Sequence, residues 1–162
     1  MIDPAGLLNQ TMVERPAEDA RRITRVFTVQ PGVLWRLFTD AKHFSGWWAS
    51  QGATCTRCEL DLRVGGAWRT EVTGDDSGQV YIIGGAYLAI EPPHRLVFTW
   101  RFGDPPNASP TSEVTLDFAA RGRGSELRLH HRSLPPDMAA SHEAGWLSAI
   151  ESLVEHISAE GL

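Results

Sequence analysis

Apolar and polar residues alternate along most of the chain between residues 21 and 132, with the period of two that half-buried β-strands show. Turn-forming residues separate the alternating segments, so we predict an antiparallel sheet of about six strands. The segments are residues 21–29, 60–72, 79–92, 95–102, 112–118 and 124–132. One face of this sheet is apolar and therefore needs a cover.

Residues 60–72, LDLRVGGAWRTEV, are predicted to form a hairpin whose loop length follows from its side chains. A two-residue turn would mix apolar and polar residues on both faces. A three-residue loop over residues 64–66 pairs Leu62 with Trp68, keeps one face apolar, and gives Gly66 the left-handed position that such loops need. We therefore expect Trp68 on the covered face of the sheet.

The last two strands have the most constrained register. A two-residue turn at Gly122 and Arg123 places two pairs of opposite charge face to face on the polar side, Asp117 with Arg128 and Glu113 with Arg132. Such opposite charges support the pairing. The apolar face then pairs Phe118 with Leu127, Leu116 with Leu129 and Val114 with His131.

Helical spacing appears in two regions. Pro31 can begin a short helix, and Asp40 can cap a second short helix through Phe44. From Asp137 a helix of about 20 residues, roughly 30 Å long, can cross a whole sheet and cover it. Gly145 inside this helix costs about 1 kcal/mol relative to alanine, which a close crossing over the sheet would justify. The apolar stripe of the helix contains Met138, His142, Trp146, Ala149, Ile150, Leu153 and Ile157.

The alternation begins at Arg21, whereas the residues before it show no sustained period. We therefore expect an N-terminal extension over residues 1–20 and a single domain over residues 21–160. Strand 21–29 would lie at an exposed edge of the sheet, which allows a homodimer.

Composition excludes several classes of partner. The 162 residues carry a formal net charge of −5, and the arginines are scattered among 20 acidic residues. A nucleic acid or an anionic membrane would require a basic face, so we expect neither nucleic-acid binding nor membrane insertion. The N-terminus lacks a basic region followed by an apolar run, and no segment reaches the roughly 18 apolar residues that span a bilayer, so we expect a cytoplasmic protein.

Cys55 and Cys58, spaced as CTRC, are the two cysteines of the chain. They are too few for a disulfide scaffold or a four-cysteine zinc site, but a redox pair stays open. Such a pair normally begins a helix after a strand, whereas this one lies on a strand, where positions three apart point to opposite faces. We therefore interpret both residues as small, partly buried thiols.

Several stretches carry a resemblance to a known family: PGVLWRLFTD, WW, LDLRVGGAW, GAYLAIEPPHRLVFTW, SEVTLDF, GSELRLHH and HEAGW. In this order they resemble the motifs of the heat-shock-protein-90 ATPase activator homologue family, a branch of the START-like, helix-grip (SRPBCC) superfamily, over about residues 21–157. The resemblance implies an α+β fold like that of the birch-pollen allergen. A curved antiparallel sheet would surround a long C-terminal helix, with two short helices after the first strand and a cavity between sheet and helix. The co-chaperone that names the family has a separate N-terminal domain that residues 1–20 are too short to supply, so we expect no chaperone interaction.

Aromatic and polar side chains on the covered faces would line this cavity. Buried polar groups cost about 1–3 kcal/mol each without a partner, so the inward ones are either hydrogen-bonded or face a wet or ligand-filled space. A filled aromatic core is the alternative to a cavity. The candidate lining residues are Trp47, Trp68, Thr70, Tyr81, Tyr87, Phe98, Trp100, Val114, His131, His142, Trp146 and Ile150.

Three functions remain open. We favour the binding of a small hydrophobic or amphipathic molecule, with aromatic walls and with His131, His142 and a tyrosine at its polar end. An enzyme of cyclase or hydrolase type could use the same cavity. No nucleophile elbow, phosphate loop or spaced carboxylate pair supports catalysis, so no catalytic residue is assigned. A metal would need ligands beyond His131, His142 and Cys58, and we expect neither a metal nor a cofactor. The third alternative is a surface interaction or stress-related module with a collapsed cavity.

Overall fold

The computed structural model describes residues 10–49 and 51–162. Within these residues eight strands form one antiparallel sheet with the order β1-β2-β8-β7-β6-β5-β4-β3. The strands are β1 (Thr11–Ala17), β2 (Ala20–Phe27), β3 (Ala53–Leu60), β4 (Ala67–Gly74), β5 (Val80–Glu91), β6 (Arg95–Phe102), β7 (Ser112–Arg121) and β8 (Gly124–Arg132). The helices are α2 (Pro31–Thr39), α3 (Ala41–Trp47) and α4 (Ala139–Ala159), and a short 3-10 helix, η1 (Pro136–Met138), precedes α4.

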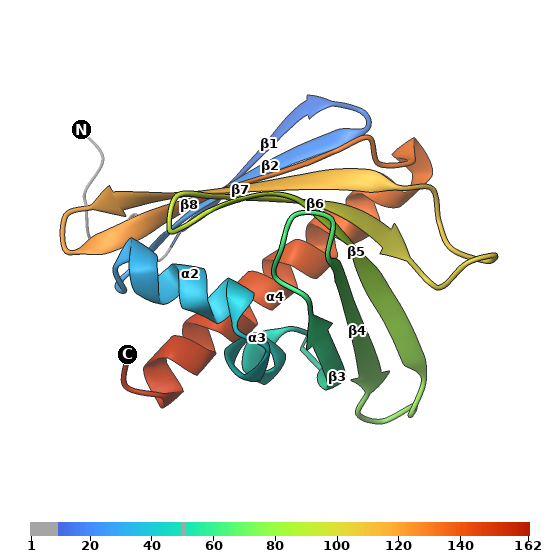
Figure 1. The fold of residues 1–162 in the computed structure, drawn as a ribbon, viewed down its shortest axis with the longest axis horizontal. Helices are drawn as coiled ribbons and strands as arrows, with labels where there is room; N and C mark the ends of the chain where they lie inside the picture. The colour runs from blue at the N-terminus through green and yellow to red at the C-terminus, as the bar shows by residue number, and fades with distance from the viewer. Residues whose placement is uncertain (1–9, 50) are drawn as a thin grey trace.

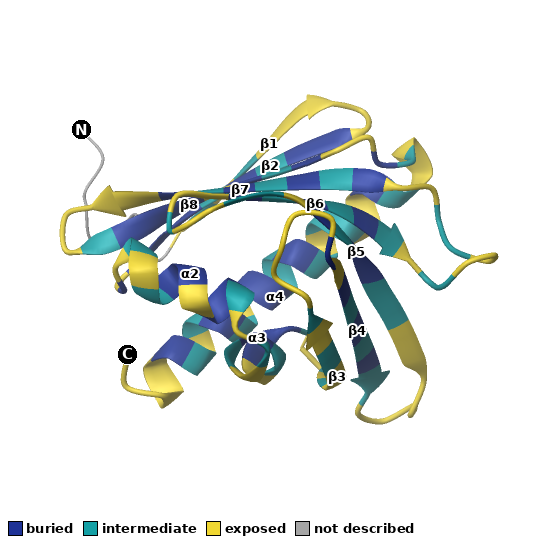
Figure 2. Cartoon of the chain, viewed as in Figure 1, coloured by how far each residue is buried: buried dark blue, intermediate teal, exposed yellow. Residues whose placement is uncertain are grey.

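The sheet curves around α4, which crosses its concave face, while α2 and α3 lie at one end (Figure 1). α2 packs on β7 and β8, and α3 contacts β3 and α4. Buried residues alternate with less buried ones along the central strands, as expected for a sheet with one covered face (Figure 2). The helix-grip architecture expected from the sequence is thus confirmed. None of the helices in the described residues is long and apolar enough to cross a bilayer.

The β7–β8 hairpin has the predicted register. Phe118 lies opposite Leu127, and Asp117 lies opposite Arg128. The ion pair of Asp117, however, is with Arg95 on β6, at 2.7 Å. The second predicted pair, Glu113 and Arg132, does form an ion pair across the hairpin. The charge pattern therefore identified the correct register, although only one of its two facing pairs makes the expected contact.

The β3–β4 connection is longer than predicted. Leu60, rather than Leu62, lies opposite Trp68, so residues 61–66 form the loop. A shift of two residues preserves the alternation, and for this reason Trp68 still points to the covered face, where it is buried.

The loop is longer because β5 runs alongside it. The backbone N–H of Gly65 donates to Tyr87 O at 2.8 Å, and Tyr87 N–H donates to Gly66 O at 2.9 Å. Gly65, with a φ of 84°, takes the left-handed conformation that we had assigned to Gly66. Gly66 is required for a different reason, because a Cβ there would lie 2.0 Å from Asp61 O.

β1 lies in the segment that the sequence pattern assigns to an extension, and it forms an edge of the sheet. It pairs with β2, which therefore lies between β1 and β8. The prediction that strand 21–29 forms an exposed edge is wrong. Arg15 on β1 and Arg21 on β2 each contact Glu143 of α4 at 2.9 Å. These two ion pairs join the N-terminal hairpin to the helix.

A bulge in β3 changes the orientation of the two cysteines. Cys55 and Arg57 pair with adjacent residues of β4, and Thr56 between them has no partner across the ladder. Because of this additional residue, Cys55 and Cys58 both pack against the core. The prediction that they point to opposite faces is therefore wrong.

Two glycines allow β5 to pass close to both of its neighbours. A Cβ on Gly84 would lie 2.6 Å from Trp68 O on β4, and a Cβ on Gly85 would lie 1.9 Å from Thr99 O on β6. Side chains supply hydrogen bonds here: Trp68 Nε1 donates to Thr99 O at 3.0 Å, and Ala86 N–H donates to Thr99 Oγ1 at 2.8 Å. The close approach therefore also fixes the orientation of the Trp68 indole.

His131 joins the sheet to α4 and has no exposed surface. Trp146 Nε1 donates to His131 Nδ1 at 3.0 Å, and Ser112 Oγ lies 2.7 Å from Nε2. An indole N–H can only donate, so Nδ1 accepts and the proton of the neutral ring is on Nε2. Burial is the main cause that lowers the pKa of His131 to about 3, and the ring is therefore uncharged near neutral pH.

We expect Gly85→Ala to lower the free energy of unfolding by about 1–3 kcal/mol or more, because the new Cβ would collide with a backbone oxygen. Gly32→Ala in α2 is the matched control, because a Cβ there meets nothing within 4 Å. The control should be neutral or stabilising by up to about 1 kcal/mol. Urea unfolding followed by tryptophan fluorescence measures both variants, and equal stabilities would contradict the close packing of β5.

We also expect His131 to make the fold sensitive to acid. The folded protein keeps this ring neutral down to about pH 3, whereas the unfolded chain protonates it below about pH 6.5. Between these values the unfolded state binds more protons than the folded state. The free energy of unfolding therefore decreases as the pH is lowered, by at most about 1.4 kcal/mol per pH unit. Urea unfolding at about pH 7 and about pH 4.5 measures this effect. The free energy of unfolding should decrease more between these pH values for the wild type than for His131→Gln. Equal losses would show that the neutral ring contributes nothing to the acid sensitivity.

Candidate functional site

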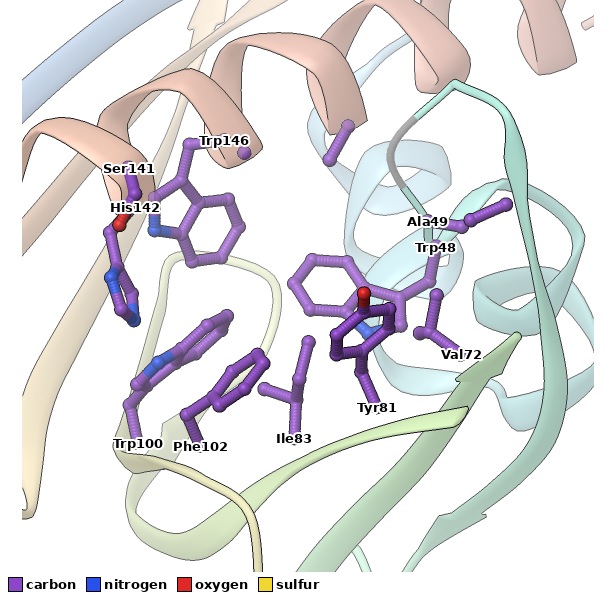
Figure 3. Close-up of a pocket in the computed structure, with 13 residues that line it drawn as sticks. Trp48, Ala49, Val72, Tyr81, Ile83, Trp100, Phe102, Ser141, His142 and Trp146 are labelled. Atoms are coloured by element: carbon purple, nitrogen blue, oxygen red, sulfur yellow. The ribbon is translucent and has the colours of Figure 1, made fainter. Parts of the chain in front are cut away.

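A pocket of about 350 Å³ lies between the inner face of the sheet at β4, β5 and β6 and the first half of α4 (Figure 3). The connection from α3 to β3 forms its third side. None of the described residues that line it is an aspartate, glutamate, lysine or arginine. The described part of the chain therefore contains an open, largely apolar pocket next to the core.

Four of the residues that the sequence indicated line this pocket: Tyr81, Trp100, His142 and Trp146. Tyr81 lies at the mouth with Phe102, where their ring centroids are 5.9 Å apart. These two side chains are 38% and 37% exposed, so the pocket opens to solvent between aromatic rings.

Three other candidates, Trp68, Tyr87 and Phe98, lie in the packed interior beside the pocket. The rings of Trp68 and Phe98 meet edge to face with centroids 5.2 Å apart. The void next to them is about 20 Å³, room for about one water molecule. This part of the interior is the filled aromatic core that the sequence left open as an alternative.

The remaining five candidates also lie outside the pocket lining. Val114 and Ile150 are core residues with almost no exposed surface. Trp47 packs between α2 and α3, and its Nε1 donates to Leu37 O at 2.8 Å. Thr70 and His131 are fully buried and hydrogen-bonded to other core groups.

Sequence reasoning missed nine lining residues: Trp48, Ala49 and Ala53 near α3, Val72, Ile83 and Phe102 on the sheet, and Ser141, Gly145 and Ala149 on α4. Val72 and Phe102 were on strand faces already predicted to be covered. Trp48 adjoins the residue that we selected, Trp47. Gly145 had a detectable signal, because glycine is unfavourable inside a helix.

Trp48 forms the rigid wall between the pocket and the filled core. Its Nε1 donates to Thr70 Oγ1 at 3.1 Å, and Thr70 in turn donates to Ile83 O at 2.9 Å. Its ring stacks on Phe44 with centroids 4.8 Å apart and meets Trp146 edge to face at 5.3 Å. Because its polar atom is hydrogen-bonded and its ring packs on two aromatic neighbours, this side chain is held in one position.

The polar groups of the pocket are few. His142 Nδ1 lies 2.9 Å from Met138 O, a carbonyl that can only accept, so this nitrogen donates and the described residues leave Nε2 without a partner. Trp100 Nε1 is a buried donor for which the described residues supply no acceptor. The rings of His142 and Trp100 are neighbours, with centroids 5.8 Å apart at one end of the pocket (Figure 3).

The two inward histidines differ in how many of their ring nitrogens are hydrogen-bonded. Their ring centroids are 5.6 Å apart, but both nitrogens of His131 are already hydrogen-bonded inside the core. His142 is therefore the imidazole of this pair with an unengaged ring nitrogen. Within the described residues, no three histidine, cysteine or acidic side chains gather as metal ligands, so Cys58 does not join the two histidines.

Comparison with known proteins supports the fold. The chain is similar to solved structures of a protein from Chromobacterium violaceum and of an AHSA1 protein from Silicibacter pomeroyi, each at 28% identity. Their TM-scores are 0.76 and 0.77, and the matches cover 85% and 87% of this chain and 96% and 99% of those chains. A protein from Rhodobacter sphaeroides, at 22% identity and a TM-score of 0.79, shares the fold over 91% of this chain and 98% of its own.

Among curated proteins no match is found. The family model described as Activator of Hsp90 ATPase homolog 1-like protein matches residues 28–158, which is most of the chain. The resemblance seen in the sequence motifs is therefore confirmed, and the chain belongs to the Activator of Hsp90 ATPase homolog 1-like protein family.

Proposed function

We propose that this protein binds a small, uncharged, apolar or amphipathic molecule in the pocket between β4, β5, β6 and α4. The observation that supports this most directly is the contrast between two adjacent regions. The interior around Trp68 leaves only about 20 Å³, whereas the neighbouring pocket holds about 350 Å³. The larger value lies at the lower end of the roughly 300–1,000 Å³ typical of small-molecule sites.

Gly145 supports the same proposal. A Cβ at this position would meet nothing within 4 Å, so the close crossing that we expected to justify the glycine is absent. Glycine in a helix interior still costs about 1 kcal/mol relative to alanine. Because Gly145 lines the pocket, any side chain there would occupy part of its volume. Packing does not explain why the helix keeps a destabilising glycine at this position, whereas the need for an open pocket does.

The polar groups indicate the kind of molecule. His142 Nε2 offers an acceptor, and Trp100 Nε1 is a buried donor that costs about 1–3 kcal/mol while it lacks a partner. A hydroxyl group has the two capacities that match these groups, because it donates one hydrogen bond and accepts others. The absence of charged side chains from the lining favours a ligand without a net charge.

Acid–base catalysis in the same pocket has less support. A reaction needs a donor or acceptor within reach of the substrate, and His142 Nε2 is the one imidazole nitrogen of the pocket that is not already engaged. His131 cannot serve without breaking its bonds to Trp146 and Ser112. Binding therefore explains more of the geometry than catalysis does.

Gly145 provides the test of the binding site. We expect Gly145→Leu to abolish binding by filling the pocket, while Gly145→Ala reduces it and stabilises the free protein by up to about 1 kcal/mol. The probe is the neutral fluorophore phenylnaphthylamine, followed by its emission and by quenching of tryptophan. A thermal-shift screen of medium-chain alcohols and aromatic ketones is the second measurement, because a ligand at 100 times its dissociation constant adds about 2.7 kcal/mol of stability.

Gly32→Leu is the matched control, since this glycine also has open space around it but lies on α2, away from the pocket. The control should bind the probe as the wild type does. Unchanged probe binding and unchanged thermal shifts in a folded Gly145→Leu variant would refute the proposal.

A further inference from the structure

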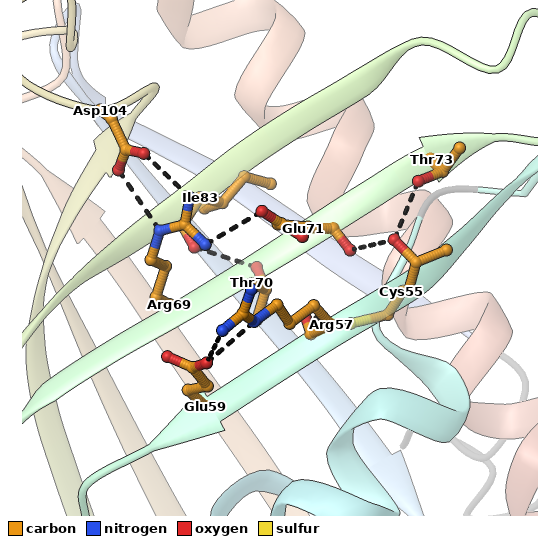
Figure 4. A network of polar contacts seen from close by, with 10 residues as sticks. Cys55, Arg57, Glu59, Arg69, Thr70, Glu71, Thr73, Ile83 and Asp104 are labelled. Atoms are coloured by element: carbon orange, nitrogen blue, oxygen red, sulfur yellow. Dashed lines mark hydrogen bonds and ion pairs between the residues drawn. The ribbon is translucent and has the colours of Figure 1, made fainter.

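The two cysteines occupy one side of an edge strand. Thr56 has no partner across the ladder, so Cys55 and Cys58 both pack against the core. Thr56, Arg57 and Glu59 are exposed. On the outer face Arg57 pairs with Glu59 at 2.6 Å (Figure 4). Cys55 and Cys58 are three residues apart in the sequence. Because of the bulge, they nevertheless lie next to each other on the same face of the strand.

The register gives the distance between the two cysteines. Cys55 lies opposite Val72 and Cys58 lies opposite Thr70, two residues apart on β4. At about 3.4 Å per residue, the cysteines span about 6.8 Å along the strand. Disulfides join residues whose Cα atoms are about 4.4–6.8 Å apart, so this pair lies at the upper end of the bridgeable range.

The surroundings allow the small movement that closure requires. Among the strands that the structure describes, β3 is the last of the sheet, and its one neighbour is β4. Both cysteines are free thiols and half-buried, which leaves them accessible to a small reagent. An edge strand with a bulge can shorten locally without breaking a second ladder.

The two thiols are not equivalent. The neighbouring Cys58 thiol is the main cause that lowers the pKa of Cys55. The same thiol contact, together with burial, raises the pKa of Cys58. Cys55 is therefore the better thiolate and Cys58 remains protonated until it reacts.

We propose that Cys55 and Cys58 are a reversible dithiol–disulfide pair that is oxidised by low-molecular-weight disulfides. The Cys55 thiolate attacks one sulfur of the small disulfide, whose S–S bond breaks and releases one small thiolate that takes up a proton. Cys58 then loses its proton to solvent and attacks the Cys55 sulfur of the mixed disulfide, which releases the second small thiol. The two cysteines lose two electrons and two protons, and one small disulfide becomes two thiols. Neither step depends on a ligand in the pocket.

Intact-mass spectrometry tests the proposal directly. The reduced, folded protein is incubated with glutathione disulfide, and the free thiols are then blocked with iodoacetamide. The wild type should retain no glutathione and take up no alkyl group, whereas Cys58→Ser should retain one glutathione on Cys55. Cys55→Ser should form a mixed disulfide more slowly than Cys58→Ser, because its remaining thiol has the higher pKa.

The double variant Cys58→Ser/Glu59→Cys is the geometric control, since it keeps two thiols but moves one to the outer face. A resolving thiol that is already in position acts as an intramolecular nucleophile, so the wild type should resolve its mixed disulfide at least about tenfold faster than this control. Circular dichroism confirms that each variant is folded. A wild-type protein that stays alkylatable or stops at the mixed disulfide, or a control that closes at the same rate, would overturn the proposal.

Discussion

The hydrogen bond from the Trp146 indole to His131 determines where α4 lies on the sheet. An indole N–H can only donate and the imidazole must therefore accept, so the contact permits one ring orientation and one tautomer. The other imidazole nitrogen meets Ser112 Oγ, which in turn donates to Trp100 O at 3.4 Å. One line of hydrogen bonds thus leads from α4 through β8 and β7 to β6. Apolar contacts alone would allow the helix to slide, whereas this buried polar line selects one position.

The position of α4 decides where the interior is filled and where it is open. Trp146 reaches Trp48 at 5.3 Å and Trp100 at 5.2 Å, and beyond these rings Trp68 closes the core. On the other side of the same rings, α4 presents Gly145 instead of a side chain that would fill the space. The pocket therefore has two causes. Trp146 fixes the position of the helix, and Gly145, the residue before it, leaves the adjacent space unfilled.

The sequence predicted the fold where two independent patterns agreed. In the β7–β8 hairpin, apolar alternation and facing charges selected the same register, and the structure has it. The β3–β4 loop had only alternation to constrain it, and alternation cannot detect a shift of two residues. The bulge at Thr56 was also invisible, because a period-two pattern assumes that no residue is inserted. β1 was missed because most of its side chains are exposed, so it carries no apolar alternation, although it pairs with β2 next to it in the sequence.

The site was predicted less well because volume and partner number are tertiary properties. The pattern indicated that His131 and His142 both face inward, but it could not count their hydrogen bonds. His131 meets Trp146 and Ser112 on two other elements, and both its nitrogens are used. Within the described residues, the one hydrogen-bond partner of the His142 ring is the carbonyl of Met138 in the preceding turn, so Nε2 stays unengaged at the pocket. The same residue type on the same covered side thus has both nitrogens engaged in one case and one nitrogen unengaged in the other, and the difference lies in which distant side chains the fold brings to each ring.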